Sequence, residues 1–557
     1  MKKRWMKWLA LGLMGSLTLT ACSNGGGSKE ANAQLTEEEK NALYTEVGTY
    51  PITNEPITMT MFQRIVPNII DYSTNEFTKY MEEKTNITWK FESATSDAVT
   101  EKINLLMAGG TPPDVFIFDT PDEAKFGVKE GLLLPIEDLI EENMPNYKKA
   151  MEEVPAIKGR TTATDGHIYN IATVNQCYHC TYAQKMWVNT MWLEKMGMDV
   201  PTTTEEFKEV CRKFLEINPK GVAIAGSNDG WFQDPTPFLM NAFILDPGYD
   251  TDPKLVLNPE GNVDVIVNKD EYKEGLKFLN ELYEMGAIYE GTFTQNSGQL
   301  RNLMAQEGEP VLFVPAGTIS DVIDSVSNNE TYRHYKTIAP IEGASGLRQA
   351  TYYKHAGIGA TSFAITKDCK YPEAALRWID YMFTLEGTLT SQFGFEGEDW
   401  KYAEEGQVGL DGRPATYEIL TAYSSEPQNK DWQDVGVSYR TADMRMGAAT
   451  EEGRDVGSPE GIEELLLQET KNNYEPYPQP EGNYDILPAI KLTAEESTEI
   501  QTISVELEKY AEEMRVAFIS GTKDIDAEWD DYIKGLEKLQ LSKYIEVYNN
   551  AYTRQYK

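Results

Sequence analysis

The motif CYHC, which contains Cys177, His179 and Cys180, is the stretch of this sequence best suited to metal or redox chemistry. Zinc sites built on such a cysteine pair usually take a second pair at a suitable spacing, and the sequence has none. We therefore expect a local disulfide or two unpaired thiols, and no metal. The other cysteines of the body, Cys211 and Cys369, are too few for a disulfide framework.

Motifs for common catalytic chemistry are absent from the sequence. It has no G-x-S-x-G nucleophile elbow, no H-E-x-x-H zinc motif and no phosphate-binding P-loop, and its histidines are scattered. With 89 acidic residues, some pair of carboxylates is always available for glycoside hydrolysis, so their number decides nothing. We expect no cofactor and no enzymatic activity. A secreted glycoside hydrolase is the alternative from another class.

A further cysteine, Cys22, follows an N-terminal segment typical of secreted proteins. Basic residues at positions 2–7 precede an apolar run over 8–21, which is shorter than the roughly 20 residues of a membrane span. The sequence Leu19-Thr20-Ala21-Cys22 resembles the bacterial lipobox, in which the cysteine is lipidated, and a Gly/Ser-rich stretch suitable for a tether follows it. We predict a signal peptide over 1–21, a lipid anchor at Cys22, a tether over 22–50 and a location on the extracellular face of the cytoplasmic membrane.

The net charge of the chain, −38, limits its partners. Such a body repels nucleic acid and anionic lipid head groups, so we expect neither as a partner. No segment after residue 22 is long and apolar enough to cross a membrane. The predicted lipid is therefore the only expected membrane contact.

Strand and helix patterns alternate along the body. The stretch ITMTMF (57–62) alternates like a strand, and apolar residues over 99–107 have helical spacing. Gly109-Gly110 and Pro112-Pro113 end that helix before the apolar strand DVFIFD (114–119). This alternation predicts a parallel sheet flanked by helices.

The same alternation returns later in the chain. Thr203 and Glu206 have the spacing of a capping box, 309–317 reads as a buried strand, and Pro372 suits the first position of a helix. The apolar stripes of these two helices place Cys211 and Trp378 in the core.

The order of several motifs resembles the family 1 extracellular solute-binding proteins of bacterial ABC sugar importers, in particular the long lipoprotein branch associated with oligosaccharide uptake in Gram-positive bacteria. The resemblance covers nearly the whole chain and depends on the order of the motifs. The motifs are KINLLMAGGTPPDVFIFD, GLLLPIEDLIEENMPNY, DGHIYNIATV, MWVNTMWLEKMGMDVPTTTEEF, AITKDCKYPEAALRWIDYMF, FGFEGEDWKY and AFISGTKDIDAEWDDYIKGLEKLQLSKYIEVYNNAY.

This resemblance implies an α/β, two-lobed periplasmic-binding-protein-like fold of type II, in which each lobe is a sheet flanked by helices. The lobes are expected to be discontinuous and joined by hinge crossovers. The predicted first lobe is 51–183 plus 346–390, and the second is 184–345 plus 391–557. The first crossover is expected soon after DGHIYNIATV and a return near ATYYKHAGIGATSFAIT.

The resemblance also implies function and partners. A monomer would capture a carbohydrate, most simply an oligosaccharide, between the lobes, and the closed form would deliver it to ABC permease subunits that work with a cytoplasmic ATPase. A peptide-binding protein of the same architecture is a further alternative, because aromatic loops would also serve extended peptides.

A sugar site needs aromatic rings that stack on flat C–H faces and polar groups that bond hydroxyls. Such groups gather at domain interfaces and at the carboxyl ends of parallel strands. The candidate residues follow predicted strands, lie near crossovers or occur in irregular, turn-rich sequence; for each, packing in the core or capping a helix is the alternative. The predicted ligand contacts are Gln63, Asp119, Tyr178, Trp231, Phe232, Tyr352, Tyr353, Trp400, Trp432, Tyr439 and Arg440.

Two departures from the family pattern bear on the ligand. Asn189 and Met191 stand where many relatives have an arginine and an aspartate. Some relatives also have a calcium loop where this chain reads NPKGVAIAGSNDG, without oxygen ligands at alternate positions, so we predict no calcium there. Arg440 and Arg445 would suit an acidic saccharide, whereas the overall negative charge argues against one, so the identity of the sugar stays open.

Overall fold

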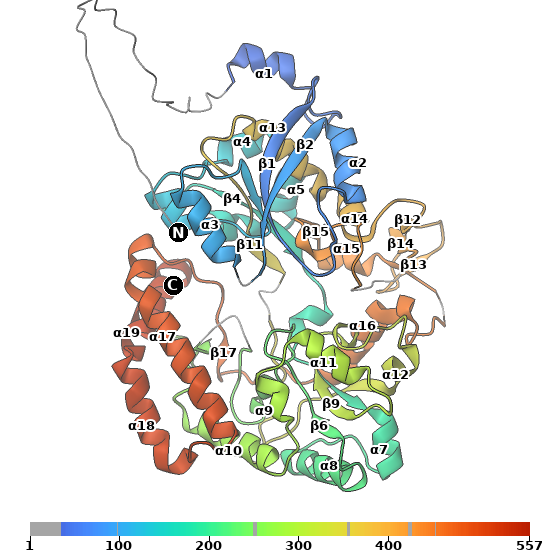
Figure 1. Cartoon of the computed structure of the whole chain (residues 1–557), viewed down its shortest axis with the longest axis vertical. Coiled ribbons are helices and arrows are strands. Elements are labelled where there is room, and N and C mark those ends of the chain that lie inside the picture. Colours follow the sequence, from blue (N-terminus) through green and yellow to red (C-terminus); the bar gives the residue numbers. More distant parts are fainter. Residues whose placement is uncertain (1–34, 97, 249–252, 354–356, 422–425, 452) are drawn as a thin grey trace, which may run out of the picture.

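The computed structural model describes residues 35–557 except 97, 249–252, 354–356, 422–425 and 452. The predicted signal peptide, Cys22 and the first part of the tether lie outside the described residues. The last part of the predicted tether is not a flexible linker, because Glu37–Leu43 form a helix and Lys40 makes an ion pair with Glu373. Two larger sheets, each flanked by helices, form an upper and a lower lobe, as Figure 1 shows. This is the two-lobed α/β fold that the resemblance implies.

The first lobe is built on a six-stranded sheet in the order β15-β4-β11-β3-β1-β2. β1 runs parallel to β2 and β3, and β11 runs antiparallel to β3 and β4. The strands are β1 (Ile57–Arg64), β2 (Ile87–Ala94), β3 (Val115–Ile117), β4 (Asn170–Asn175), β11 (Ile358–Ile365) and β15 (Tyr439–Arg440). The strands expected over 57–62 and 114–119 are confirmed.

Helices cover this sheet. As the sequence predicts, α3 ends before Gly109, and Pro372 opens α13. Trp378 of α13 is fully buried, as expected. The helices are α1 (Glu37–Leu43), α2 (Glu76–Thr85), α3 (Val99–Ala108), α4 (Glu137–Asn143), α5 (Pro145–Glu153), α6 (Ala156–Thr161), α13 (Pro372–Asp380) and α14 (Leu385–Phe393).

The second lobe contains a four-stranded sheet in the order β10-β5-β9-β6. β6 and β9 are parallel, whereas β5 is antiparallel to β9 and β10. The strands are β5 (Met186–Asn189), β6 (Val222–Ile224), β9 (Val311–Pro315) and β10 (Tyr335–Ile338). The strand expected over 309–317 is confirmed.

The helices of the second lobe pack into two hydrophobic clusters, a large one that includes α8, α10 and the C-terminal helices and a smaller one that includes α11, α12 and α16. Thr203 caps α8 by accepting from the backbone N–H of Glu206, and Cys211 of that helix is fully buried. Of the three C-terminal helices at one side of the lobe (Figure 1), α17 and α18 lie against α10, and α19 packs against α17 and α18. The helices are α7 (Thr190–Met196), α8 (Thr204–Ile217), α9 (Pro235–Met240), α10 (Asp270–Glu284), α11 (Ser297–Met304), α12 (Asn329–His334), α16 (Ile462–Asn473), α17 (Ala494–Ile519), α18 (Ile525–Lys538) and α19 (Leu541–Tyr556).

The predicted lobe boundary at residue 391 differs from the structure. β15 pairs with β4 in the first sheet, and Trp432, Val435 and Val437 belong to the core under that sheet. Figure 1 shows the orange segment beside the upper lobe. The sequence around β15 gave no sign of this pairing, because a strand of two residues is too short to show an alternating apolar pattern. Its place in the first lobe is decided by contacts with residues remote in sequence.

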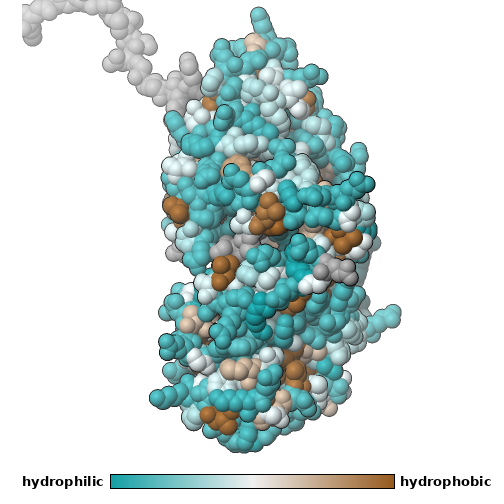
Figure 2. All heavy atoms as spheres, turned by 90° about the vertical axis from the view of Figure 1, so that its right-hand side faces the viewer, coloured by the Kyte–Doolittle hydropathy of each residue, from teal (hydrophilic) through white to brown (hydrophobic). Residues whose placement is uncertain are grey.

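Smaller elements complete the fold. β12 (Trp400–Tyr402) pairs with β14 (Tyr417–Ile419), β13 (Val408–Gly409) with β16 (Ala449–Thr450), and β7 (Leu255–Leu257) lies between β8 (Val263–Val265) and β17 (Asp485–Ile486). α15 (Ala442–Met446) follows β15. No helix in the described part of the chain has the length and apolarity needed to cross a bilayer. The face shown in Figure 2 is largely hydrophilic, with scattered apolar side chains.

Candidate functional site

A cavity of about 860 Å³ lies between the two lobes. The second lobe contributes the loops that follow β6 and β9. Because these strands are parallel, their carboxyl ends meet at one edge of the sheet, and both loops reach the cavity there. The first lobe contributes the end of β4, the start of β11, the end of α14 and β15. A ligand in this space would touch both lobes.

Three aromatic side chains form one wall of the cavity. The rings of Trp231 and Phe232 are 5.5 Å apart at their centroids, and Phe232 lies 5.3 Å from Tyr353. The hydroxyl of Tyr353 donates to the carbonyl of Pro247 at 3.0 Å and accepts from the amide of Gln184 at 2.8 Å. Aromatic faces held in this way are suited to stacking against a sugar ring.

The loop that carries Trp231 and Phe232 is fixed by its own hydrogen bonds. The hydroxyl of Ser227 donates to the side chain of Gln233 at 2.7 Å and accepts from the backbone N–H of Gly230. Phe232 has a positive φ of 53°, which is uncommon for a bulky residue and concentrates at functional sites. The loop is therefore pre-organised, and a ligand would not have to order it.

Trp231 rests on the end of β9. A Cβ atom added at Gly317 would lie only 2.2 Å from Cε3 of the indole, and the backbone N–H of Gly317 donates to the carbonyl of Trp231 at 3.2 Å. On another side, the imidazole of His179 meets the indole edge-on at 6.4 Å. The absence of a side chain at Gly317 is thus what allows the indole to lie flat there.

Polar side chains form another part of the cavity wall, and their charges are paired with charges of opposite sign. The guanidinium of Arg445 lies 3.4 Å from the carboxylate of Glu463 and donates to the side-chain oxygen of Asn175 at 2.8 Å. Arg440 donates to the side-chain oxygen of Gln392 at 3.2 Å. The cavity also presents further cations and carboxylates, namely Arg160, Arg454, Asp321, Glu460 and Glu464. This wall offers both donors and acceptors for hydroxyl groups.

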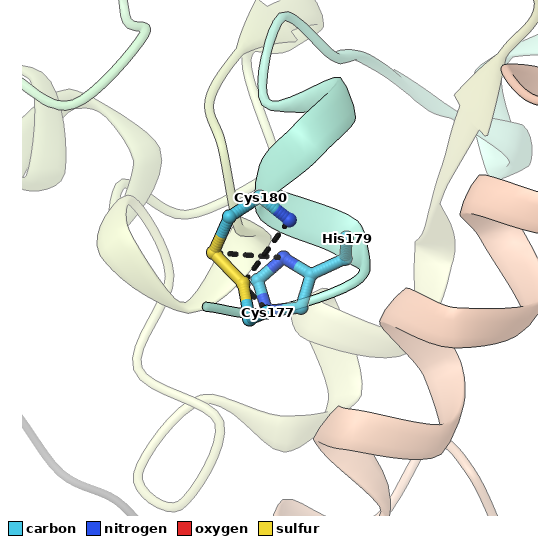
Figure 3. A group of neighbouring side chains, drawn as sticks. All are labelled: Cys177, His179 and Cys180. Carbon is cyan, nitrogen blue, oxygen red and sulfur yellow. Dashed lines mark hydrogen bonds between the residues drawn. A yellow bond between two sulfur atoms is a disulfide. The ribbon is translucent and has the colours of Figure 1, made fainter. Parts of the chain in front are cut away.

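The CYHC motif lies at the cavity, in the crossover between β4 and β5. Cys177 and Cys180 form a disulfide, and His179 points alongside it (Figure 3). The donor atoms of the three residues lie within 4.8 Å of one another, but sulfurs joined in a disulfide are not the thiolates that a metal requires. One of the two alternatives left open by the sequence, the local disulfide, is therefore the one present.

Burial changes the titration of two groups beside this motif. Burial, together with the positive charges of Lys185 and Arg445, holds the pKa of His179 well below its ordinary value, so the imidazole is neutral at neutral pH. Burial also lowers the pKa of Lys185 to about 7. The Nζ atom of Lys185 donates to the carbonyls of His179 and Tyr182, each at 2.7 Å, and so secures the crossover segment.

Four of the predicted contacts come together in the cavity wall: Trp231, Phe232, Tyr353 and Arg440. The remaining predicted contacts do not line this cavity. They are Gln63, Asp119, Tyr178, Tyr352, Trp400, Trp432 and Tyr439.

Trp400 and Trp432 are core residues, which corrects their prediction as ligand contacts. Trp400 is fully buried in a small cluster with Leu389 and Tyr417, and the indole N–H of Trp432 donates to the hydroxyl of Thr78 at 3.0 Å. Both lie in irregular sequence without a helical stripe, so the local pattern gave no sign of what packs over them.

Gln63 and Asp119 are engaged within the first lobe. The amide of Gln63 donates to the carbonyl of Val435 at 3.0 Å, and Asp119 forms an ion pair with Arg64. Asp119 follows β3 as expected, whereas Gln63 lies within β1, because that strand continues to Arg64; both side chains hold the lobe together.

The three predicted tyrosines outside the cavity have partners elsewhere. The hydroxyl of Tyr178 donates to Glu475 and that of Tyr439 donates to Glu153, each at 2.6 Å. Tyr352 stacks on Tyr182 at 5.0 Å.

Several cavity residues carry no signal that sequence reasoning could use. Arg160, Gln392 and Glu463 are on helices or at their ends, and only the packing of the lobes directs them to one space. His179 was noticed as part of CYHC, but for redox chemistry and not as part of this wall. Asn189, which replaces an arginine of relatives, is buried and caps α7, and it does not line the cavity.

Comparison with known proteins identifies the class to which this fold and cavity belong. Residues 67–388 match the family described as "Bacterial extracellular solute-binding protein", and the chain belongs to this family. The two lobes and the cavity between them are consistent with that membership.

Individual relatives narrow the comparison. The chain is 28% identical over 490 residues to the fructooligosaccharide ABC transporter substrate-binding protein FusA of Streptococcus pneumoniae serotype 4, and the match covers 85% of each chain. The solved structure of Streptococcus pneumoniae FusA in complex with kestose superposes with a TM-score of 0.71 at 24% identity, covering 89% of this chain and 99% of that one. A solute-binding protein from Bifidobacterium longum infantis, described as binding HMO, superposes with a TM-score of 0.68 at 18% identity over 90% and 99% of the two chains. These structural matches establish the fold.

Proposed function

We propose that this protein captures a neutral oligosaccharide between its lobes and passes it to the permease of an ABC importer. The observation that carries the proposal is the cavity between the lobes, which is lined by a pre-organised group of aromatic rings and by amide, carboxylate and guanidinium groups. Aromatic faces and fixed hydrogen-bonding groups are the two features that recognise a sugar. The relative named as a fructooligosaccharide-binding protein supports the same class of ligand.

The charge balance of the cavity favours a neutral sugar. Arg445 already lies 3.4 Å from Glu463, and Arg454 lies 4.0 Å from Glu464. An acidic saccharide would have to compete with these carboxylates for the guanidinium groups and would face Asp321 and Glu460 in the same space. A neutral chain of hydroxyls can accept from the arginines and donate to the carboxylates.

Closure is the expected functional event. A ligand that binds both lobes shifts the population towards the closed form by its extra affinity for that form. The sugar is held without chemical change, and the closed pair of lobes is what a permease would recognise. Lipidation at Cys22, which lies outside the described residues, would keep the protein near that permease. Membrane fractionation of a Cys22→Ser variant tests the anchor. If Cys22 carries the lipid, the variant should be lost from the membrane fraction.

A thermal-shift panel tests the ligand class. Neutral fructo-, malto- and xylo-oligosaccharides, uronic acid oligosaccharides and short peptides are compared at equal concentration. A bound ligand present at 100 times its Kd raises the unfolding free energy by about 2.7 kcal/mol. Stabilisation by a neutral series alone supports the proposal, whereas stabilisation only by peptides or uronic acids overturns it.

Two further measurements make the test specific. Trp231→Ala should weaken binding of the stabilising sugar about tenfold or more while the far-UV circular dichroism stays unchanged, because it removes the indole from the aromatic wall. An assay for new reducing ends after incubation with the same sugar should stay at the background level. Release of reducing ends would instead identify a glycoside hydrolase.

A further inference from the structure

A second cavity, of about 820 Å³, lies directly behind the aromatic wall of the first. One side of it is the loop 227–234, and the other is the face of α17. That helix presents Val505, Glu508, Lys509 and Glu512 to the space, at the spacing that places residues on one helix face. Residues of α9 and of α17, which are the green and red helices with these labels in Figure 1, line this cavity.

Trp231 and Phe232 line both cavities. The two spaces are therefore neighbours that share these two side chains as a common wall. The wall is fixed, because Gly317 supports the indole and the bonds among Ser227, Gly230 and Gln233 hold the loop. The two cavities therefore adjoin at a fixed pair of aromatic rings.

The chemistry of the second cavity matches that of the first. Aromatic surface is contributed by Phe238 and Phe293, in addition to the shared pair. Carboxylates are contributed by Asp229, Asp234, Glu508 and Glu512. This combination again provides faces for stacking and acceptors for hydroxyl groups.

The polar part of this wall is held in place by a buried cation. Arg515 is 9% exposed; its guanidinium lies 2.9 Å from Asp234 and 2.7 Å from Glu512, and it also donates to the hydroxyl of Thr236. The carboxylates of Asp234 and Glu512 are therefore oriented before any ligand arrives, which lowers the entropic cost of binding one.

The sizes of the two spaces bear on the length of the ligand. Small-molecule sites are typically about 300–1,000 Å³, so each cavity alone has the volume of a complete site. A ligand that occupies both cavities has to be an extended saccharide chain, because a single sugar ring is too small to reach both sides of the shared wall.

We propose that the second cavity is a further saccharide subsite, which binds the units of a longer oligosaccharide that extend past Trp231 and Phe232. This inference builds on the proposed function. It adds that the protein selects for chain length, because short oligosaccharides fill the first cavity alone and longer ones gain the contacts of the second.

A blocking substitution tests the subsite. Val505 is 60% exposed, so Val505→Trp adds bulk to the second cavity without disturbing the core. Binding of kestose, nystose and longer inulin-type oligomers is measured by isothermal titration calorimetry. We expect wild-type affinity to rise with chain length. Val505→Trp should leave kestose within about twofold and weaken the longer oligomers tenfold or more.

The controls separate this subsite from a general effect of the added ring. Glu506→Trp places the same ring at the next, exposed position, which does not line the cavity, and should behave like wild type at every chain length. Val505→Ala removes bulk and should not weaken the longer oligomers.

The outcomes distinguish this inference from the proposed function. If wild type binds the oligomers but Val505→Trp changes the affinity for all lengths equally, or for none, the second cavity is not a subsite. If wild type binds no oligosaccharide of the series and none in the panel, the proposed function itself fails, and the subsite fails with it.

Discussion

The substitution Gly317→Ala adds a single methyl group at the position that supports the indole of Trp231, and so tests whether the placement of this ring matters for binding. The added Cβ would lie 2.2 Å from Cε3 and 2.3 Å from Cζ3 of Trp231. Carbon atoms pack best at about 3.5 Å or more, so the indole has to withdraw by about 1.3 Å or tilt away. The φ angle of Gly317 is not in the left-handed region, so alanine is compatible with the backbone and the strain falls on the indole.

The expected effect on binding follows from the stacking energy. An aromatic contact contributes about 0.5–1.5 kcal/mol beyond its buried area, so misplacing the indole should weaken sugar binding roughly two- to tenfold. Overpacking of this kind also lowers the unfolding free energy by about 1–3 kcal/mol. Affinity is measured by titration calorimetry well below the melting temperature of the variant, where both proteins are fully folded.

A double-mutant cycle and a matched glycine make the result decisive. In a Trp231→Ala background, Gly317→Ala should cost no further affinity, because the group it displaces is gone. The control is Gly436→Ala, where the added Cβ would lie 3.6 Å from Cε3 of Trp432, an ordinary contact in the core. Two results would refute this role of Gly317. One is that Gly317→Ala binds the sugar like wild type, and the other is that Gly317→Ala lowers the sugar affinity as much in the Trp231→Ala background as in wild type.

Two further predictions concern the crossover between the lobes. Burial lowers the pKa of Lys185 from 10.5 to about 7 in the folded chain. Between these pH values the amine is therefore protonated in the unfolded chain and largely neutral in the folded one. The contribution of Lys185 to the unfolding free energy should therefore rise as the pH increases from about 7 to 10. Thermal unfolding of Lys185→Met should show a smaller rise over this pH range than wild type. The disulfide of Cys177 and Cys180 spans three residues of sequence separation, so its loss in the double serine variant should cost only about 2 kcal/mol in chemical denaturation. An unchanged pH slope in the first variant, or a loss of folding in the second, would contradict these expectations.

Elements with a strong local pattern could be predicted from the sequence. The capped stripe of α8, the alternation in β1 and the proline at the start of α13 each fix a helix or strand from neighbouring residues alone. Burial within these elements follows as well, which is why Cys211 and Trp378 were placed in the core. Such predictions succeed because the spacing of the apolar residues along the chain indicates which face of the helix or strand packs against the core.

Aromatic residues in irregular sequence could not be sorted in this way. Trp231 and Trp432 both occur in turn-rich stretches, yet one lines the cavity and the other is 1% exposed. The partner of the Trp432 indole, Thr78, lies 354 positions away in the sequence. No local pattern contains that contact.

The sequence by itself determined the alternation of strands and helices, the acidic body and the order of motifs that leads to a two-lobed solute-binding protein. Only the tertiary structure decided which of the candidate side chains meet. A glycine after β9 supports a tryptophan from the loop after β6, and arginines from the first lobe face carboxylates from the second. The reason is physical: periodicity along a chain encodes which face of an element is buried, whereas a site between two lobes depends on contacts between segments that are remote in sequence.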